Sequence, residues 1–316
     1  PGAPVQTFLI FLIAYTLSQF FRAFLAVIAP ELAAELKLSA ADLGNISAIW
    51  FVVFALAQFP VGMALDRIGP RRTVPVLMLA AAAGSLLFAR ADGFATCLVA
   101  MALIGLGCSP IYMGALYVFG RIYPASRFAL LSSWMLAIGS AGNLLGTTPL
   151  AYAAEAYGWR TTFSAIAAGT LLSALLVLLL VQDPPRADKP TGSGSLLGGL
   201  AEVLSIRALW PLIPISAVSY ALVAVERGLW VGPFLSEVYG LAPIARGNVV
   251  LVMAIAMSVG ALVYGPLDQW LGTRKWIVVA GNAVTVVAFA ALAWVSGSSL
   301  AASTCLLAAI GSIGMT

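Results

Sequence analysis

The stretch GMALDRIGPRR, residues 62–72, has a second, weaker copy further along the chain, GPLDQWLGTRK at residues 265–275. The offset between the copies is 203 residues, and it also places Pro30 on Pro233 and Asn45 on Asn248. Apolar composition alone rarely aligns prolines and polar residues in this way, so the chain contains an internal repeat. The repeat indicates two structural halves with related folds.

The composition around this repeat is that of a membrane protein. Hydrophobic residues make up 62% of the chain and charged residues 9%, and the mean hydropathy is +1.03. These values lie far outside the range of soluble globular domains. We therefore predict an all-α membrane protein.

Spanning about 30 Å of hydrocarbon takes about 20 apolar residues in a helix. Ten stretches meet this length, at residues 6–29, 43–65, 72–90, 94–120, 128–153, 161–182, 207–232, 245–267, 275–295 and 299–316. The same offset superposes the first four of them on the last four. Because an even number of helices separates the copies, the halves should be related by an axis along the membrane normal, with the substrate path between them.

Basic residues between the stretches set the predicted orientation. Ten of them fall on one side, including Arg67, Arg71, Arg72 and Arg186, and four fall on the other, namely Lys37, Arg90, Arg160 and Arg246. By the positive-inside rule the richer side is cytoplasmic. We expect a multi-pass protein of the bacterial inner membrane with a cytoplasmic N-terminus. The sequence pI of about 9.1 is then explained without a nucleic-acid partner.

One polar segment divides the chain. Asp183 to Ser195, DPPRADKPTGSGS, has the proline, glycine and serine content of a linker. We predict an N-terminal six-helix bundle at 1–182, a cytoplasmic linker at 183–206 and an incomplete C-terminal bundle of four helices at 207–316. Within the linker, Leu196 to Ile206 could form an interfacial helix.

The repeated stretch, together with Gly158–Trp159–Arg160, resembles the signature loops of the major facilitator superfamily. The resemblance implies two pseudo-symmetric bundles, twelve helices of which ten are present, and alternating access by rocking of the halves. It also implies a conformational latch at the loops, which includes Gly62, Asp66, Arg67, Gly69, Arg71, Arg72, Asp268 and Arg274. Asp66 and Arg67 would cap helix ends, and the glycines would allow a tight turn and close helix approach. A simple positively charged loop would explain the same residues without a latch.

Three ionisable residues fall deep inside predicted spans, where a charge is costly and needs a reason. They are Arg22 in the first span and Glu226 and Arg227 in the seventh, which is its repeat partner. Guanidinium groups bind carboxylate or phosphate in a bidentate manner, so a symmetric arginine pair suits an anionic substrate. The placement resembles the organic-phosphate exchangers and organic-anion symporters of the superfamily. A structural ion pair between Glu226 and Arg22 would also account for these charges.

Further site residues follow from helical spacing. Glu226 is the one carboxylate deep in a span, which makes it the candidate for proton coupling. The other predicted substrate contacts share helix faces with the charges or could complete the pocket, although packing would explain them equally well. They are Tyr15, Gln19, Tyr112, Trp134, Tyr220 and Trp230.

The sequence does not indicate an enzyme, because it has no histidine, no glycine-rich phosphate loop and no nucleophile beside a base. We expect no cofactor and no metal site. A Met-x-x-x-Met pair, Met253 and Met257, leaves open a Cu(I) carrier. The sequence is also compatible with a carrier of an uncharged metabolite and with a membrane sensor that transports nothing. We expect a monomer whose partners are a small anionic solute, the bilayer and, for a symporter, protons.

Overall fold

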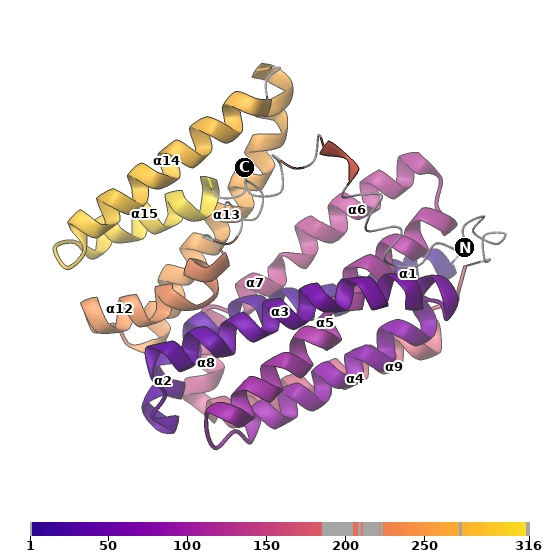
Figure 1. Cartoon of the computed structure of the whole chain (residues 1–316), viewed down its shortest axis with the longest axis horizontal. Helices are drawn as coiled ribbons and strands as arrows, with labels where there is room; N and C mark the ends of the chain where they lie inside the picture. The colour runs from indigo at the N-terminus through magenta and orange to yellow at the C-terminus, as the bar shows by residue number, and fades with distance from the viewer. Residues whose placement is uncertain are drawn as a thin grey trace.

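The computed structural model describes residues 2–184, 205–207, 210, 221, 224–271 and 274–313. Within these ranges, the side chains of residues 2–4, 125, 126, 129, 261–275 and 313 are not described. The described chain is almost entirely helical, as predicted. Figure 1 shows the helices of the first half, in indigo to rose, lying beside those of the second half, in orange to yellow.

The helices of the first half follow the first six predicted spans. They are α1 (Gly2–Ala23), α2 (Leu25–Leu36), α3 (Ala40–Arg67), α4 (Pro70–Ala89), α5 (Phe94–Ile122), α6 (Ala125–Gly139), α7 (Ala141–Leu145), α8 (Thr148–Tyr157) and α9 (Trp159–Leu180). The second half contains η2 (Glu226–Trp230), α12 (Val231–Tyr239), α13 (Pro243–Leu271), α14 (Arg274–Val295) and α15 (Leu300–Ile313).

Seven of the described helices are long and apolar enough to cross a membrane, and they belong to α1, α3, α4, α5, α9, α13 and α14. The fifth predicted span is present but divided into α6, α7 and α8 by breaks at Ser140 and at Gly146–Thr147. Most of the seventh span, the linker from 185 to 204 and its predicted interfacial helix lie outside the described residues.

The first predicted span ends too early at residue 29. After a break at Phe24 the helix continues as α2 through Pro30 to Leu36. Proline has no N–H, so the carbonyl oxygen of Ala26 loses its donor four residues ahead. That oxygen lies against Gly232 of α12, where a Cβ atom would overlap it. The proline-weakened turn is therefore the place where helices of the two halves meet.

Close helix packing in the first half depends on small residues, as is common in membranes. α5 packs against both α3 and α4. A Cβ on Gly105 would lie 2.5 Å from the Trp50 carbonyl oxygen, and one on Gly84 would lie 2.7 Å from the Ala100 carbonyl oxygen. Phe24, Phe88 and Phe163 fill the core near α2, at the end of the first half that we call the α2 end, with ring centroids 4.8 to 5.4 Å apart.

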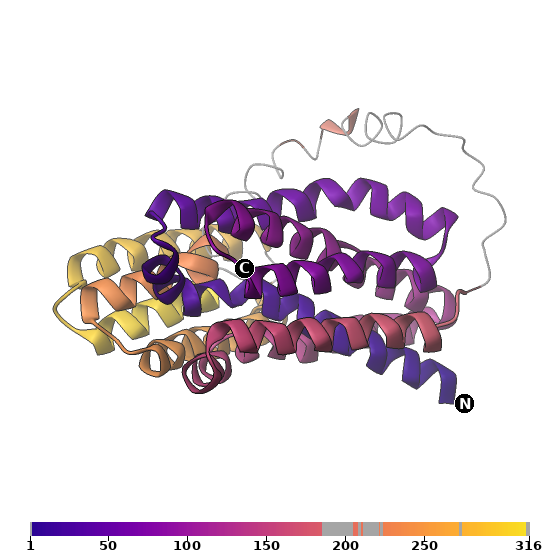
Figure 2. The same cartoon turned by 90° about the horizontal axis from the view of Figure 1, so that it is seen from below.

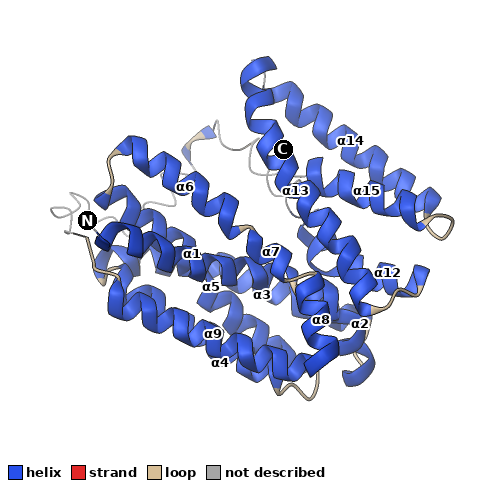
Figure 3. Ribbon diagram, turned by 180° about the vertical axis from the view of Figure 1, so that it is seen from behind, coloured by secondary structure: helices blue, strands red, loops and turns tan. Residues whose placement is uncertain are grey.

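The two halves contact each other mainly through α2 and α8 of the first half and η2, α12 and α13 of the second, with smaller contacts from α1, α3 and α7. Figure 3 shows α13 crossing beside α8 and α2, next to the short α12. Figure 2 gives the view from below, with α9 and α1 of the first half beside each other. Gly247 permits the α13–α8 contact, since a Cβ there would lie 3.0 Å from the Thr148 Cα.

Candidate functional site

Arg22 and Arg227 lie where the first helix of each half meets. A Cβ on Gly228 would be 3.3 Å from the Arg22 carbonyl oxygen, so the backbone of Arg22 runs directly beside η2. Arg227 is 7% exposed. The structure thus brings the two predicted arginine positions to one contact between α1 and η2.

The Arg22 guanidinium lies against two aromatic rings of α3. Its carbon Cζ is 5.3 Å from the ring centroid of Trp50 and 4.9 Å from that of Phe54, which are cation–π distances. The two rings stack on each other with centroids 5.1 Å apart. The Nε atom of Arg22 is buried and has no hydrogen-bond partner among the described residues. The guanidinium is therefore positioned by aromatic faces and keeps donor capacity for another group.

Glu226 begins a π-helical segment, in which the Val231 N–H donates to the Glu226 carbonyl five residues back. Such segments occur frequently at functional sites. Both carboxylate oxygens of Glu226 are buried and accept no hydrogen bond within the described part of the chain. No ion pair joins Glu226 to Arg22 among those residues. The structure therefore lends no support to a structural ion pair between Glu226 and Arg22.

The other predicted contacts divide into two groups. Tyr15 and Gln19 are in the interior of the first half, where the Tyr15 ring is 5.2 Å from that of Tyr112 and the Gln19 Oε1 atom is buried without a partner in the described residues. Trp134 is 50% exposed on α6, and Trp230 is 39% exposed with its ring 4.0 Å from the Cβ position of Gly44. Tyr220 lies outside the described residues.

The predicted latch surrounds the turn between α3 and α4. Gly69 has φ = +96°, a conformation that favours glycine. The carboxylate that caps α4 comes from Asp183, which accepts the Arg71 backbone N–H at 2.8 Å. Asp66, which the sequence suggests as a cap, lies in the last turn of α3. Arg67 lies in the last turn of α3, where a cation is favourable.

Gly62 has space in this conformation, because a Cβ there would be 3.9 Å from the Met113 sulfur. That distance is an ordinary van der Waals contact, so the structure shows no close helix approach that requires glycine at position 62. Arg71 also donates from Nε to the Leu178 carbonyl at 3.1 Å, which ties the turn to the end of α9. The side chains of Asp268 and Arg274, from the second copy, lie outside the described residues.

Sequence reasoning missed an ion pair between the halves. Arg246 of α13 donates from Nη2 to the Glu31 Oε1 atom at 2.5 Å and to the Val27 carbonyl at 2.8 Å. The side chain of Arg246 is 2% exposed and that of Glu31 is 40% exposed. Nearby, the Thr148 hydroxyl donates to the Asn248 Oδ1 atom at 2.9 Å. These bonds join the two halves where α2 and α8 meet α13.

Met253 and Met257 are both buried on α13. Met253 belongs to an apolar cluster with Leu235 and Leu307, and its side chain lies against Gly311 of α15. No group of three His, Cys, Asp or Glu side chains that could hold a metal ion occurs in the described ranges. The surroundings of Met253 are those of a packing residue.

Comparison with known families gives one match over nearly the whole chain. A family model described as Major Facilitator Superfamily matches residues 11–316.

Two relatives represent the similar proteins. The "Putative tartrate transporter" of Agrobacterium vitis is 23% identical over 309 residues, covering 89% of this chain and 67% of that protein. The membrane sensor protein UhpC of Salmonella typhimurium is 27% identical over 284 residues, covering 80% of this chain and 61% of the sensor. The chain thus spans about two thirds or less of the length of these relatives.

A solved structure agrees with the fold. A bacterial homologue of the human lysosomal transporter Spinster, in an inward-facing and unoccupied conformation, superposes with a TM-score of 0.79 at 19% identity. The match covers 100% of this chain and 73% of that one. At this level of identity the likeness concerns the fold alone.

Proposed function

We propose that this chain, which belongs to the Major Facilitator Superfamily of membrane transporters, moves a small organic anion between its two halves by alternating access. Arg22 binds the negative charge, Arg227 contributes from the opposite half, and Glu226 is the coupling carboxylate of a proton symporter. The protein acts as a monomer in the bacterial inner membrane with its N-terminus in the cytoplasm.

The observation that carries the proposal is the environment of Arg22. Its guanidinium is flanked by Trp50 and Phe54 rather than neutralised by a carboxylate, and its Nε is buried without a partner in the described residues. A cation without a counter-charge is costly in a membrane interior even when it is only partly buried, as Arg22 is. An anionic substrate with a carboxylate or phosphate group would supply that charge and accept bidentate hydrogen bonds. Tartrate, named for one relative, is an organic dianion of this kind.

The second half supports the same chemistry. Arg227 is buried on the π-helical segment that contacts Arg22, so a ligand held there would touch both halves. A ligand with differential contacts in two conformations can shift the equilibrium between them. Glu226, with both oxygens buried beside this contact, would need a proton or a cation when the site is empty.

The test is uptake into proteoliposomes loaded with buffer alone. Tartrate, a sugar phosphate, nitrate and an uncharged sugar are offered with and without an inward proton gradient. We expect uptake of an organic anion, loss of at least about a hundredfold in Arg22→Gln, since a charge-assisted bidentate contact contributes about 3 kcal/mol, and partial activity in Arg22→Lys. Arg90→Gln, which changes an exposed arginine after α4, is the matched control.

Glu226→Gln separates coupling from binding. We expect it to abolish the response to the proton gradient while counterflow exchange of the anion continues. Equal uptake by wild type and Arg22→Gln contradicts the arginine site, and uptake of the neutral sugar alone contradicts the anionic substrate.

A second candidate is a membrane sensor that binds an anion without transporting it, and the similarity to UhpC favours it. It predicts ligand binding that depends on Arg22 together with no uptake above protein-free liposomes. Isothermal titration of the purified protein with tartrate and a sugar phosphate, beside the uptake assay, distinguishes the two functions.

A further inference from the structure

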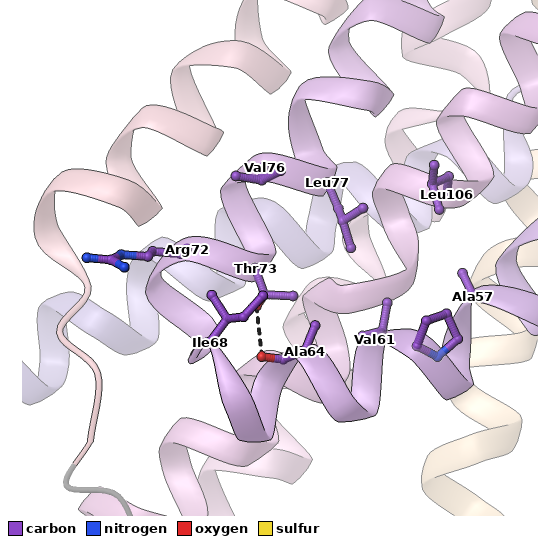
Figure 4. Close-up of a pocket in the computed structure, with 10 residues that line it drawn as sticks. Ala57, Val61, Ala64, Ile68, Arg72, Thr73, Val76, Leu77 and Leu106 are labelled. Carbon is purple, nitrogen blue, oxygen red and sulfur yellow. Dashed lines mark hydrogen bonds between the residues drawn. The ribbon is translucent and has the colours of Figure 1, made fainter. Parts of the chain in front are cut away.

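A groove lies between α3 and α4, with α5 as its floor. It has a volume of about 350 Å³ and is lined on α3 by Ala57, Val61 and Ala64, just after α3 by Ile68, on α4 by Leu77 and on α5 by Leu106. Figure 4 shows these side chains along one continuous path. Val76, on the rim, is 62% exposed, so the groove opens to the surroundings of the bundle and is separate from the contact between the halves.

The dimensions of the groove match half a bilayer. From Ala57 to Ile68, α3 rises about 16 Å at about 1.5 Å per residue. Half of a hydrocarbon core of about 30 Å is about 15 Å. Water gains little in an apolar space of this kind, because it finds no hydrogen-bond partners there. An extended acyl chain satisfies both the length and the lining.

One end of the groove is positively charged. Figure 4 shows Arg72 beside Ile68, with its guanidinium extending beyond the apolar lining at the end near the α3–α4 turn. Arg67 and Arg71 belong to the same turn, but Arg71 donates to the Leu178 carbonyl. Arg72 is exposed and makes no hydrogen bond or ion pair with the described residues. Its charge is therefore not neutralised by any described residue.

We propose that this groove binds one acyl chain of an anionic phospholipid whose phosphate rests on Arg72. The apolar slot holds the chain, and the arginine selects the headgroup, because a basic residue at the membrane surface attracts anionic lipid. The lipid would lie against the turn between α3 and α4 and against the start of α4. The site is independent of the substrate path between the halves.

The experiment is native mass spectrometry of the whole purified chain with a phosphatidylglycerol and a phosphatidylcholine of identical acyl chains. Wild type should retain one phosphatidylglycerol in preference to phosphatidylcholine. Arg72→Gln should lower that preference about fivefold, the equivalent of one surface charge. Ala64→Phe, which fills the groove, should abolish retention of both lipids.

Two matched variants control for charge and size. Arg121→Gln removes an exposed arginine at the end of α5, and Leu79→Phe enlarges an exposed apolar residue of α4 outside the groove. Both should behave as wild type, and glycerol phosphate without acyl chains should not compete.

Two results overturn the proposal. One is lipid retention in Arg72→Gln and Ala64→Phe that equals that of the controls. The other is an Ala64→Phe variant that unfolds at lower temperature in lipid-free detergent while wild type retains no lipid, which would mean that a protein segment occupies the groove.

Discussion

Arg22 combines a formal charge with neighbours that do not neutralise it. Trp50 and Phe54 hold its guanidinium through the faces of their rings, at 5.3 and 4.9 Å. Such contacts position a cation but leave its N–H groups free to bind an anion. The aromatic pair is therefore as important to the proposed site as the arginine that the sequence indicates.

The positioning role of the aromatic pair can be measured. Phe54→Leu keeps an apolar side chain but removes one ring face, and we expect the KM for the transported anion to rise about twofold to tenfold, since a cation–π contact contributes about 0.5 to 1.4 kcal/mol. The maximal rate should change less. Phe51→Leu is the control, because the Phe51 ring packs edge-on against Trp50 with centroids 4.9 Å apart, whereas the cation–π contacts of Arg22 are with Trp50 and Phe54. Equal KM values in both variants would contradict the role of Phe54.

The sequence predicts the charged residues of this site but not their neighbours. Arg22, Glu226 and Arg227 are identifiable because charges are rare in apolar spans. Trp50 and Phe54 have the same i, i+4 spacing as any lipid-facing pair, so nothing in the sequence distinguishes them. Glu31 and Arg246 are 215 residues apart, and only the packing of α2 against α13 brings them together.

At the scale of helices, the apolar stretches predict the spans well because about 20 residues are needed to cross the membrane. The breaks at Phe24 and Ser140 are not predictable in the same way. They follow contacts with other helices, such as the approach of Gly142 to the Thr16 carbonyl and of Gly232 to the Ala26 carbonyl. The apolar stretches predict the number of helices, whereas contacts between helices determine where each helix breaks.

The start of α4 depends on a residue from the end of α9. Asp183 accepts the Arg71 N–H, and Gly69 itself has no side chain to cap the helix. Asp183→Ala should lower the free energy of unfolding by about 1 kcal/mol, the usual cost of a lost cap. Asp183→Asn keeps an acceptor and should lose less. Denaturant titration in mixed micelles, followed by circular dichroism, measures both, and identical curves for alanine and wild type would contradict the cap.

Hydrogen bonds and an ion pair join α2 to the start of α9, at the end of α9 opposite to Asp183. The Trp159 indole and the Arg160 guanidinium donate to Glu35 at 2.7 and 2.8 Å, and these bonds hold the pKa of the Glu35 carboxyl below its usual value. A lowered folded pKa means that stabilisation is present above the unfolded pKa, about 4.3, and is lost as the pH falls through the folded value.

The pH dependence of these bonds is testable. Glu35→Gln should lower the thermal unfolding temperature at pH 7, and its difference from wild type should shrink below about pH 4.3. Glu237→Gln, which changes an exposed carboxylate of α12, should give no such trend. A difference in unfolding temperature between Glu35→Gln and wild type that stays constant from pH 7 to below about pH 4.3 would contradict this role of Glu35.

For the whole molecule, the decisive contacts are those that hold the halves together at the α2 end. Arg246 is almost completely buried and has Glu31 as its carboxylate partner, while the Val27 carbonyl accepts a second bond. The glycines at 232 and 247 let the backbones approach closely at the same end. The alternating access that we propose would require this set of contacts to break once in every cycle.

Removing one partner should therefore shift the conformational equilibrium. Glu31→Gln leaves a buried guanidinium without its counter-charge, which destabilises the closed arrangement. Because Glu31 is partly exposed, we expect a moderate effect, with the open population at the α2 end rising about tenfold. Spin labels at Lys37 and Glu237, both exposed at that end, report the separation by pulsed electron resonance.

Glu155→Gln, a nearby exposed carboxylate of α8, should leave the distance distribution unchanged. A Glu31→Gln distribution identical to wild type would mean that the glycine contacts alone hold this end closed, and in that case Gly232→Val, which would overlap the Ala26 carbonyl, should open it.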